Sequence, residues 1–476
     1  MIVKRIAILA SYDWSMRHAM ADFLDFVDPV VRYRGKEYKI ELTRVKAVPV
    51  LCGKDLRDVA DFVVDRTTHW SEYYRNWAHQ AMNSGLQLAN NTYTFFNYNK
   101  HTTYDIMARA MHPADRFPTT VLLPSFGPTT SDHYAHERWV AQQEALIENT
   151  KFGWDPNRKE VDFAAVEKEL ADHDRHTRAA ARMRRDFYPP GDFLRETMEK
   201  VFGNKYPVFL KKTEGGGGSD VHKISNLEEL YQKYDATGGR SFHLQEGILD
   251  FDIFIRCMAI GPLVLPMKYL PDSPLHQHYS PDKPRYDRKV ISRLVNYVKF
   301  INSYHRWTYN SYESLIRNGQ IHPIDFANGC PDSHFTSLHV HFPWLIVSLL
   351  KWLSFCAITD KDMRMDMEHM RYFKVLNDPN IPQIEKYEFC ARASEEYFET
   401  EKFMDFCAEN FSDLEERMIA FYDEKLDEII GHAIEWSSFP LNEHDYFFRH
   451  YKEMMDTIFR PNARAYLTDA IFDDEA

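Results

Sequence analysis

The sequence contains few cysteines, and they form none of the patterns that bind zinc or build a disulfide framework. Six cysteines are spread over 476 residues, with no CxxC pair among them. This spacing excludes a cysteine-rich metal site or a disulfide-stabilised secreted scaffold as the organising feature of the chain. We therefore expect a reducing compartment, the cytoplasm.

The sequence also lacks a block of basic residues. It has 58 Lys and Arg against 71 Asp and Glu, which gives a formal net charge of -13. Because a protein that neutralises nucleic-acid phosphates needs a basic stripe, this balance argues against a nucleic acid as a partner. A soluble enzyme fits the composition better.

The sequence has few long apolar runs, and it lacks two common glycine-rich motifs that bind nucleotides. The first residues, MIVKRIAILASYDW, have only a short apolar run and no small-residue cleavage site, so they predict a strand and no signal peptide. Residues 342–358 are the most apolar, but they contain Lys351 and are shorter than the about 20 residues of a membrane span. We expect a buried helix there and no membrane partner. No GxGxxG follows the first strand, and no Lys-Ser/Thr pair follows the glycine run.

Aromatic residues, by contrast, are abundant. They make up 14% of the chain, so most of its length is expected to be folded, with room for two or three domains. Residues 1–95 alternate between strand-like and helix-like patterns, which predicts an open α/β domain with a mostly parallel sheet. Residues 336–476 show acidic amphipathic patterns and are expected to form a C-terminal helical region.

Residues 96–335 lie between these regions and carry the candidate sites. Within them, residues 125–190 are rich in Asp, Glu, Arg, His and Ala, which predicts an insertion of charged helices. Its Arg and His side chains either cover a solvated helix surface, which the composition favours, or face a substrate. Residues 191–247 are expected to form a small subdomain.

A strong hairpin signal lies in residues 309–332, YNSYESLIRNGQIHPIDFANGCPD. The Asn-Gly pair at 318–319 favours a tight turn between two strands. In such a hairpin alternate side chains share a face, so Glu313 and Asp325 can lie opposite each other, and Asn328 follows. Carboxylate and amide oxygens suit Mg²⁺, with phosphates and water in its other positions. The alternative is an edge hairpin whose acids face water.

A second candidate site surrounds four consecutive glycines in PVFLKKTEGGGGSDVHKI. The pattern predicts two strands joined by a loop, with Lys211 and Lys212 on the first strand. Because glycines weaken regular elements, the loop is either a mobile linker or, as we favour, a flap that closes on a ligand. Its backbone N–H groups can cover phosphates while one lysine supplies a positive charge. The residues of this predicted flap are Gly215, Gly216, Gly217, Gly218 and Ser219.

Other charged residues are candidates for contacting the same ligand. Lys100 begins a short amphipathic helix, where the helix dipole disfavours a cation, so either an anion or solvent is its partner. Arg256 and Lys268 lie on facing strands of another hairpin, where they either contact one ligand or are ordinary surface charges. Asp252 lies between the strand HLQEGI and this hairpin, where an exposed backbone edge and a carboxylate could hold adenine and ribose.

The order of these motifs resembles that of the ATP-grasp superfamily, whose members include glutathione synthetase, D-alanine ligase and RimK-like enzymes. The resemblance covers roughly residues 92–332. It implies that Lys100 and Lys211 contact the nucleotide and that the predicted flap closes over its triphosphate. It assigns the adenine to Gln245, Glu246, Gly247 and Ile248, the ribose to Asp252, and the metal to Glu313, Asp325 and Asn328. The implied cofactors are ATP and Mg²⁺ or Mn²⁺.

The sequence departs from the family pattern near the metal ligands. The asparagine usually follows the second acid by two residues, whereas Asp325 and Asn328 are three apart, so we expect a β-bulge to absorb the extra residue. The first metal acid is Glu313, where Asp is commoner. Many ligases also have an arginine just before that acid, and the residues expected to replace it here are Arg256, Lys268 and Arg306.

The resemblance implies a fold of the α/β and α+β classes. Its parts are an N-terminal open α/β domain of the pre-ATP-grasp kind, a pair of α+β ATP-grasp subdomains and the C-terminal helical region. The implied reaction activates a carboxylate as an acyl phosphate and joins it to an amine, with Arg256 or Lys268 as catalytic cation. The alternatives are a phosphotransferase acting on a small-molecule hydroxyl and a non-catalytic nucleotide-binding protein. A small-molecule carboxylate and an amine are the expected partners, and the sequence leaves a homo-oligomer open.

Overall fold

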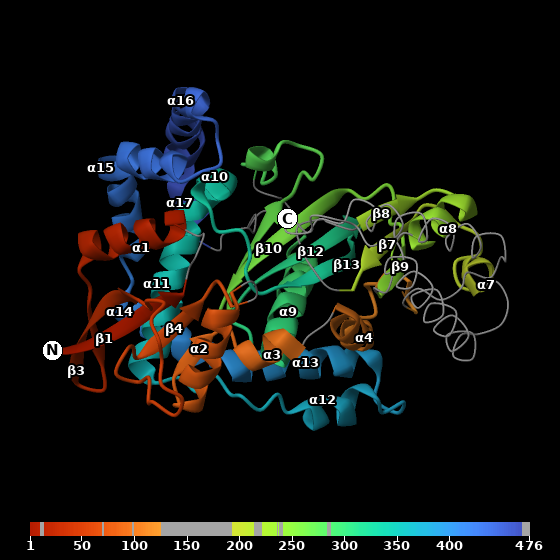
Figure 1. The fold of residues 1–476 in the computed structure, drawn as a ribbon, viewed down its shortest axis with the longest axis horizontal. Coiled ribbons are helices and arrows are strands. Elements are labelled where there is room, and N and C mark those ends of the chain that lie inside the picture. Colours follow the sequence, from red (N-terminus) through yellow and green to blue (C-terminus); the bar gives the residue numbers. More distant parts are fainter. Residues whose placement is uncertain are drawn as a thin grey trace, which may run out of the picture. The chain divides into compact units, whose positions relative to one another are not determined.

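The structure, a computed structural model, describes residues 1–9, 14–68, 71–97, 100–124, 193–213, 221–235, 237, 241–282 and 287–468. The predicted insertion at 125–190 and the predicted glycine flap lie outside the described residues. The chain divides into two compact units (Figure 1). The first unit comprises Met1–Phe117 and Asp250–Ala476, and the second comprises Pro118–Leu249.

The first unit begins with an open, mostly parallel sheet in the order β2-β3-β1-β4-β5. Its strands are β1 (Ile2–Leu9), β2 (Val30–Tyr33), β3 (Lys36–Arg44), β4 (Phe62–Asp65) and β5 (Gln87–Ala89). Every pair of neighbours is parallel except β2 with β3. Its helices are α1 (Trp14–Val27), α2 (Glu72–Asn83) and α3 (Thr92–Asn97). The α/β arrangement predicted from residues 1–95 is confirmed.

A second sheet in the same unit is antiparallel, in the order β11-β10-β12-β13. Its strands are β10 (Ile253–Ile260), β11 (Leu263–Lys268), β12 (Tyr309–Arg317) and β13 (Gln320–Asn328). Between β12 and β13, Asn318 and Gly319 have φ angles of 52° and 73°, the left-handed values of a type I′ turn. The hairpin predicted from the Asn-Gly pair is therefore confirmed.

Helices cover both faces of this second sheet. Ile255 and Cys257 of β10 pack in one core with α9 (Arg288–His305), while Met258 and Ile260 pack in another with α11 (Phe342–Thr359). Because successive side chains of a strand point to opposite faces, the alternation of buried residues along β10 is what holds the sheet between the two helices.

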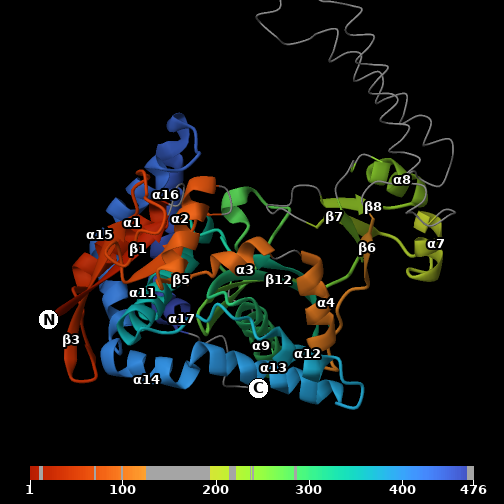
Figure 2. The ribbon, with the colours of Figure 1, turned by 60° about the horizontal axis from the view of Figure 1, so that its bottom comes forward.

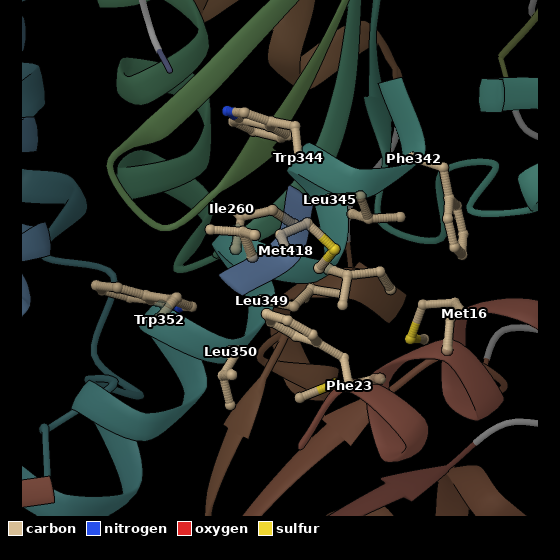
Figure 3. Packing of buried hydrophobic residues seen from close by; sticks show 14 of the residues in the cluster. Met16, Phe23, Ile260, Phe342, Trp344, Leu345, Leu349, Leu350, Trp352 and Met418 are labelled. Carbon is tan, nitrogen blue, oxygen red and sulfur yellow. The ribbon is translucent and has the colours of Figure 1, made fainter. Parts of the chain in front are cut away.

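The helix α11 forms the centre of the larger core. Leu345 and Leu349 lie among Phe23 of α1, Ile260 of β10 and Met418 of the C-terminal region (Figure 3). The span Phe335–Thr359 is long and apolar enough to cross a membrane by length and composition, and 89% of its apolar 18-residue window is buried inside the protein. The buried helix predicted at 342–358 is this element.

The C-terminal helices are α10 (Phe335–Leu338), α12 (His369–Leu376), α13 (Gln383–Phe398), α14 (Thr400–Asn410), α15 (Leu414–Glu435), α16 (His444–Met454) and α17 (Ala463–Leu467). All of them except α12 contribute to this core together with the N-terminal sheet, a grouping that the order of the chain does not reveal, whereas Tyr372 and Leu376 of α12 pack in the core with α9. The helix α13 runs beside α9, where Lys299 and Glu395 form an ion pair at 2.8 Å (Figure 2).

The second unit is a small α+β layer. Its antiparallel sheet has the order β6-β9-β7-β8. Its elements are β6 (Thr120–Leu123), α7 (Phe193–Lys200), β7 (Val208–Lys212), β8 (Val221–Ile224), α8 (Leu227–Asp235) and β9 (Phe242–Glu246). Leu194 and Met198 of α7 and Leu230 of α8 pack on Leu210 and Leu244 of the sheet. Together the units confirm a fold of the α/β and α+β classes with a C-terminal helical region.

A buried ion pair joins the loop after α4 (Lys100–Ala110) to α9 and β13. The side chain of Asp115 is 0% exposed and accepts hydrogen bonds from Arg293 at 2.7 and 3.0 Å, from the Tyr297 hydroxyl at 2.7 Å and from the Ile321 N–H at 3.0 Å. We expect Asp115→Asn to lower the free energy of unfolding by about 3 kcal/mol, because it leaves a largely buried guanidinium without its counter-ion.

Urea unfolding measures this effect. The control is Asp105→Asn, which breaks the exposed pair between Asp105 and Arg109 at 3.0 Å on α4. The control should change stability by no more than about 0.5 kcal/mol. An equally small change for Asp115→Asn would contradict the prediction.

Candidate active site

A row of charged side chains crosses the second sheet of the first unit. Arg256 on β10 pairs in register with Glu313 on β12, and Glu313 pairs with Asp325 on β13. Because directly opposed residues share a face of the sheet, these side chains lie side by side. Lys100, the first residue of α4, continues the row, with its Nζ 2.8 Å from Asp325 Oδ2.

The row places a cation at each end and carboxylates in the middle. Arg256 Nε lies 3.5 Å from Glu313 Oε1, so each acid has its own cation on the outer side. The side chains of Lys100 and Arg256 are 10% and 13% exposed, whereas those of Glu313 and Asp325 are 24% and 33% exposed. The carboxylates therefore remain accessible, and their mutual repulsion favours a further cation near them.

A pair of β-bulges brings Asp325 into this row. The register of β12 with β13 shifts by one residue on either side of the pair that contains Asp325. The paired positions are Ser311 with Asn328, Glu313 with Asp325, and Ser314 with Pro323. The predicted bulge is therefore confirmed, and it absorbs the longer spacing between Asp325 and Asn328.

Asn328 lies at the Arg256 end of the row. When its amide is oriented so that both groups have partners, Oδ1 accepts from Arg256 Nη2 at 3.3 Å and Nδ2 donates to the Cys330 carbonyl at 3.1 Å. Its backbone N–H donates to Asn310 Oδ1 at 2.8 Å. The three residues expected to bind metal, Glu313, Asp325 and Asn328, are thus brought together.

Arg256 is held by contacts on several sides. Its guanidinium lies over the rings of Tyr269 and Tyr279, at 5.2 and 5.7 Å from their centroids, and Nη2 lies 3.4 Å from Ser311 Oγ. Burial opposes its charge, but the nearby Tyr279 and Glu313 raise the pKa of the guanidinium above its ordinary value. Arg256 is therefore a fixed cation at any ordinary pH.

Lys268 and Arg306 do not lie beside Arg256. Lys268 pairs in register with Ile255, so it lies on the face opposite to Arg256, and its Nζ is 3.6 Å from Asp282 Oδ2. The expectation that Lys268 and Arg256 contact one ligand is corrected, because the register offsets them by one residue. Arg306 is buried after α9 and pairs with Glu368 at 2.9 Å. Of the three expected replacements for the family arginine, Arg256 alone lies beside Glu313.

The acids of the row fit a divalent cation. Asp325 Oδ2 contacts Lys100, but Oδ1 is buried and has no hydrogen-bond partner among the described residues. A buried acceptor without a partner is costly, and a metal ion would satisfy it. Within the described ranges no group of three or more His, Cys, Asp or Glu side chains could hold a metal. Two carboxylates with a nearby amide are nevertheless the ligand set usual for Mg²⁺ with a nucleotide.

In the second unit, Lys211 and Gln245 come together. Lys211 Nζ donates to Gln245 Oε1 at 2.7 Å, and Gln245 Nε2 donates to Thr120 Oγ1 at 2.8 Å. Gln245 is only 1% exposed, so its side chain joins three strands of the sheet and orients the lysine. The nucleotide contact expected of Lys211 stays a prediction.

The other residues assigned to adenine are Glu246, the last residue of β9, and the two residues that follow it. The Glu246 N–H donates to the Thr119 carbonyl at 2.8 Å, and the Gly247 N–H donates to the Pro207 carbonyl at 3.1 Å. A Cβ on Gly247 would lie 2.5 Å from that carbonyl oxygen, so the close approach requires glycine. Ile248 is buried at 4% exposure. Adenine recognition by this segment stays a prediction, and it would have to use backbone groups other than these two N–H groups.

Asp252 has a structural contact in the first unit. Its Oδ2 accepts from the Asn318 N–H at 2.6 Å, so the carboxylate supports the turn of the β12–β13 hairpin. It lies about 13 Å along β10 from Arg256, by the rise of a strand. The assignment of Asp252 to a ribose stays a prediction.

Sequence analysis missed several residues that shape this site. An asparagine, a residue disfavoured in strands, inside a predicted strand could have indicated Asn310, which is 0% exposed. No local signal indicated the others, because their partners are distant in the chain. The missed residues are Tyr104, Tyr269, Tyr279, Asn310 and Ser311.

No family model and no curated protein matches this sequence. Solved structures to which this chain is similar include ligases and a protein with an ATP-grasp domain. They include a D-alanine–D-alanine ligase from Bacillus anthracis complexed with ATP, at 9% identity over 84% of this chain and 99% of that chain, with a TM-score of 0.39. A D-cycloserine synthetase has 11% identity over 75% of this chain and 99% of that chain, with a TM-score of 0.42. A RimK domain ATP-grasp protein from Sphaerobacter thermophilus has 13% identity over 69% of this chain and 92% of that chain, with a TM-score of 0.38.

Proposed function

We propose that this protein is an ATP- and Mg²⁺-dependent ligase that activates a carboxylate as an acyl phosphate and joins it to an amine. The row of Lys100, Asp325, Glu313 and Arg256 carries the proposal. The accessible carboxylates suit the metal ion of a metal-bound triphosphate, and the cations on either side of them suit its phosphates. Bound Mg²⁺ would neutralise charge on the phosphate oxygens during transfer.

Each residue of the row has its own task in this proposal. Glu313 and Asp325 hold the metal, and Asn328 is its third candidate ligand. Lys100 exchanges its contact with Asp325 for a phosphate oxygen when the nucleotide binds. Arg256 binds the substrate carboxylate and stabilises the negative charge that develops on it.

The proposed reaction has two steps. A carboxylate oxygen attacks the γ-phosphorus, the bond to the bridging oxygen breaks, and ADP leaves with that oxygen. The amine nitrogen then attacks the acyl carbon, phosphate leaves with the bonding electrons, and the ammonium product loses a proton to give the amide. Arg256 faces negative charge in both steps, because a carboxylate oxygen is the nucleophile in the first and carries the charge of the tetrahedral intermediate in the second.

Trapping the acyl intermediate tests this proposal. The full-length protein is incubated with ATP, Mg²⁺, hydroxylamine and pools of amino acids or small organic acids. We expect one acid to yield a hydroxamate together with an equal amount of ADP, since hydroxylamine replaces the amine. Asp325→Asn, assayed in parallel, should form neither product.

The same assay separates the alternatives. A phosphorylated alcohol with no hydroxamate would favour a phosphotransferase. Nucleotide binding without turnover of any pool would favour a non-catalytic nucleotide-binding protein. The cytoplasmic location, the absence of nucleic-acid and membrane partners and a homo-oligomer also stay predictions.

A further inference from the structure

The bulges around Asp325 interrupt the regular hydrogen-bond ladder between β12 and β13. Ile324 has no opposite residue in the register, and the step from Asp325 to Asn328 spans one residue more than the step from Glu313 to Ser311. Backbone groups released from a ladder need other partners when they are buried. The carbonyls of the two residues that flank Asp325, Ile324 and Phe326, both accept hydrogen bonds from side chains.

Tyr104 provides the partner on one side. Its hydroxyl donates to the Ile324 carbonyl at 2.9 Å. The residue lies on α4, four positions after Lys100, so the same face of this helix contacts the backbone beside Asp325 and its carboxylate. The Tyr104 ring is 2% exposed and packs against Phe117 and Phe326, with centroids at 5.4 and 5.2 Å. Because these contacts hold the ring in place, the hydroxyl can be removed without removing the packing of the ring.

Asn310 provides the partner on the other side. Its Nδ2 donates to the Phe326 carbonyl at 3.1 Å and to Asn302 Oδ1 at 2.8 Å, and its Oδ1 accepts from the Asn328 N–H at 2.8 Å. The amide therefore spans the second bulge and links both of its ends to α9. The backbone of Asp325 is thus fastened at the residue before it and at the residue after it.

We propose that Tyr104 and Asn310 are positioning residues that fix the double bulge so that Asp325 and Asn328 face one divalent cation. The inference rests on the proposed function, because it assumes that these residues hold the metal. It adds that the metal affinity of this chain depends on two side chains that do not touch the metal. Partners of metal ligands commonly contribute about tenfold to a hundredfold in affinity.

The test is Tyr104→Phe, which removes a single hydroxyl. Its matched control is Tyr451→Phe, which removes another buried hydroxyl of the first unit that donates to a backbone carbonyl, that of Thr336, at 2.6 Å. Both variants should lose a similar amount of thermal stability. Mn²⁺ binding is followed by electron paramagnetic resonance with a non-hydrolysable ATP analogue present. We expect the dissociation constant for Mn²⁺ to rise about tenfold in Tyr104→Phe and to stay unchanged in Tyr451→Phe.

Other outcomes separate this inference from the proposed function. If the wild type binds Mn²⁺, Asp325→Asn loses it and Tyr104→Phe binds as the wild type does, the positioning role is wrong and the metal assignment stands. Equal weakening in Tyr104→Phe and Tyr451→Phe would also overturn the positioning role. If Asp325→Asn binds Mn²⁺ as tightly as the wild type, the proposed metal site fails, and this inference fails with it. Asn310→Ala should weaken binding further, but it also removes buried hydrogen bonds, so Tyr104→Phe decides.

Discussion

Asp325→Asn is expected to lower Mg²⁺-dependent ATP turnover about a thousandfold, since a metal ion supplies several kcal/mol of charge stabilisation in such reactions. The substitution keeps the shape of the side chain but removes its charge. It also replaces one oxygen with an N–H donor. The Oδ1 atom of Asp325 is buried with no hydrogen-bond partner among the described residues, so the wild-type site offers the metal a free acceptor. Steady-state ADP release at saturating ATP and Mg²⁺ measures the effect.

A second ion pair of the chain provides the control. Lys299 and Glu395 lie 2.8 Å apart with exposures of 12% and 43%, close to the 2.8 Å, 10% and 33% of Lys100 and Asp325. Lys299 belongs to α9, which packs on the face of the sheet opposite to the row. Glu395→Gln should leave turnover unchanged while losing a comparable ion pair. Wild-type ADP release by Asp325→Asn would reject the metal assignment.

The hairpin could be predicted because the information is local. An Asn-Gly pair sets a two-residue turn, and the turn sets which residues face each other. The turn pairs Arg317 with Gln320, and this register continued without a bulge would set Glu313 opposite Ile324. The bulge at Ile324, which was not predicted, is therefore what sets Glu313 opposite Asp325. The other bulge, between Asp325 and Asn328, was predicted because their spacing departs from the family pattern.

The position of Lys268 could not be predicted in the same way. The sequence places Lys268 and Arg256 on facing strands, but the face depends on the register around the turn at Gly261. A difference of one residue sends a side chain to the other face. In the structure Arg256 pairs with Met267, and Lys268 therefore lies on the other face of the sheet.

Contacts between distant parts of the chain could not be predicted from local sequence patterns either. Lys100 was expected to contact either an anion or solvent, and nothing in its neighbourhood identified Asp325, which lies 225 residues away. The contact of Tyr104 with β13 spans a similar interval, 220 residues. Both depend on how α4 packs against the sheet, which the tertiary structure decides.

Arg256→Met is expected to lower hydroxamate formation by two to three orders of magnitude, the cost usual for losing a charge-stabilising donor in an active site. Methionine fills a similar volume between Tyr269 and Tyr279 but carries no charge. Arg256→Lys keeps the charge and loses the planar fork that reaches Glu313, Ser311 and Asn328 together, so we expect an intermediate loss of about tenfold. The rate with the acid identified by trapping, at saturating ATP and Mg²⁺, is the measurement.

The metal affinity of Arg256→Met distinguishes a catalytic role from a structural one. Arg256 Nε lies 3.5 Å from Glu313 Oε1, so removing this cation leaves more negative charge for Mn²⁺ to neutralise. We therefore expect Mn²⁺ binding to be kept or tightened while the reaction is lost, which a collapsed site would not show. The control is Arg371→Met, which removes another guanidinium paired with a carboxylate, Glu396, at 2.6 Å and lying 5.8 Å from the ring of Phe389. Lys268 lies on the other face of the sheet and Arg306 is paired with Glu368, so neither can replace Arg256 from its present position. Normal hydroxamate formation by Arg256→Met would therefore contradict the role of Arg256.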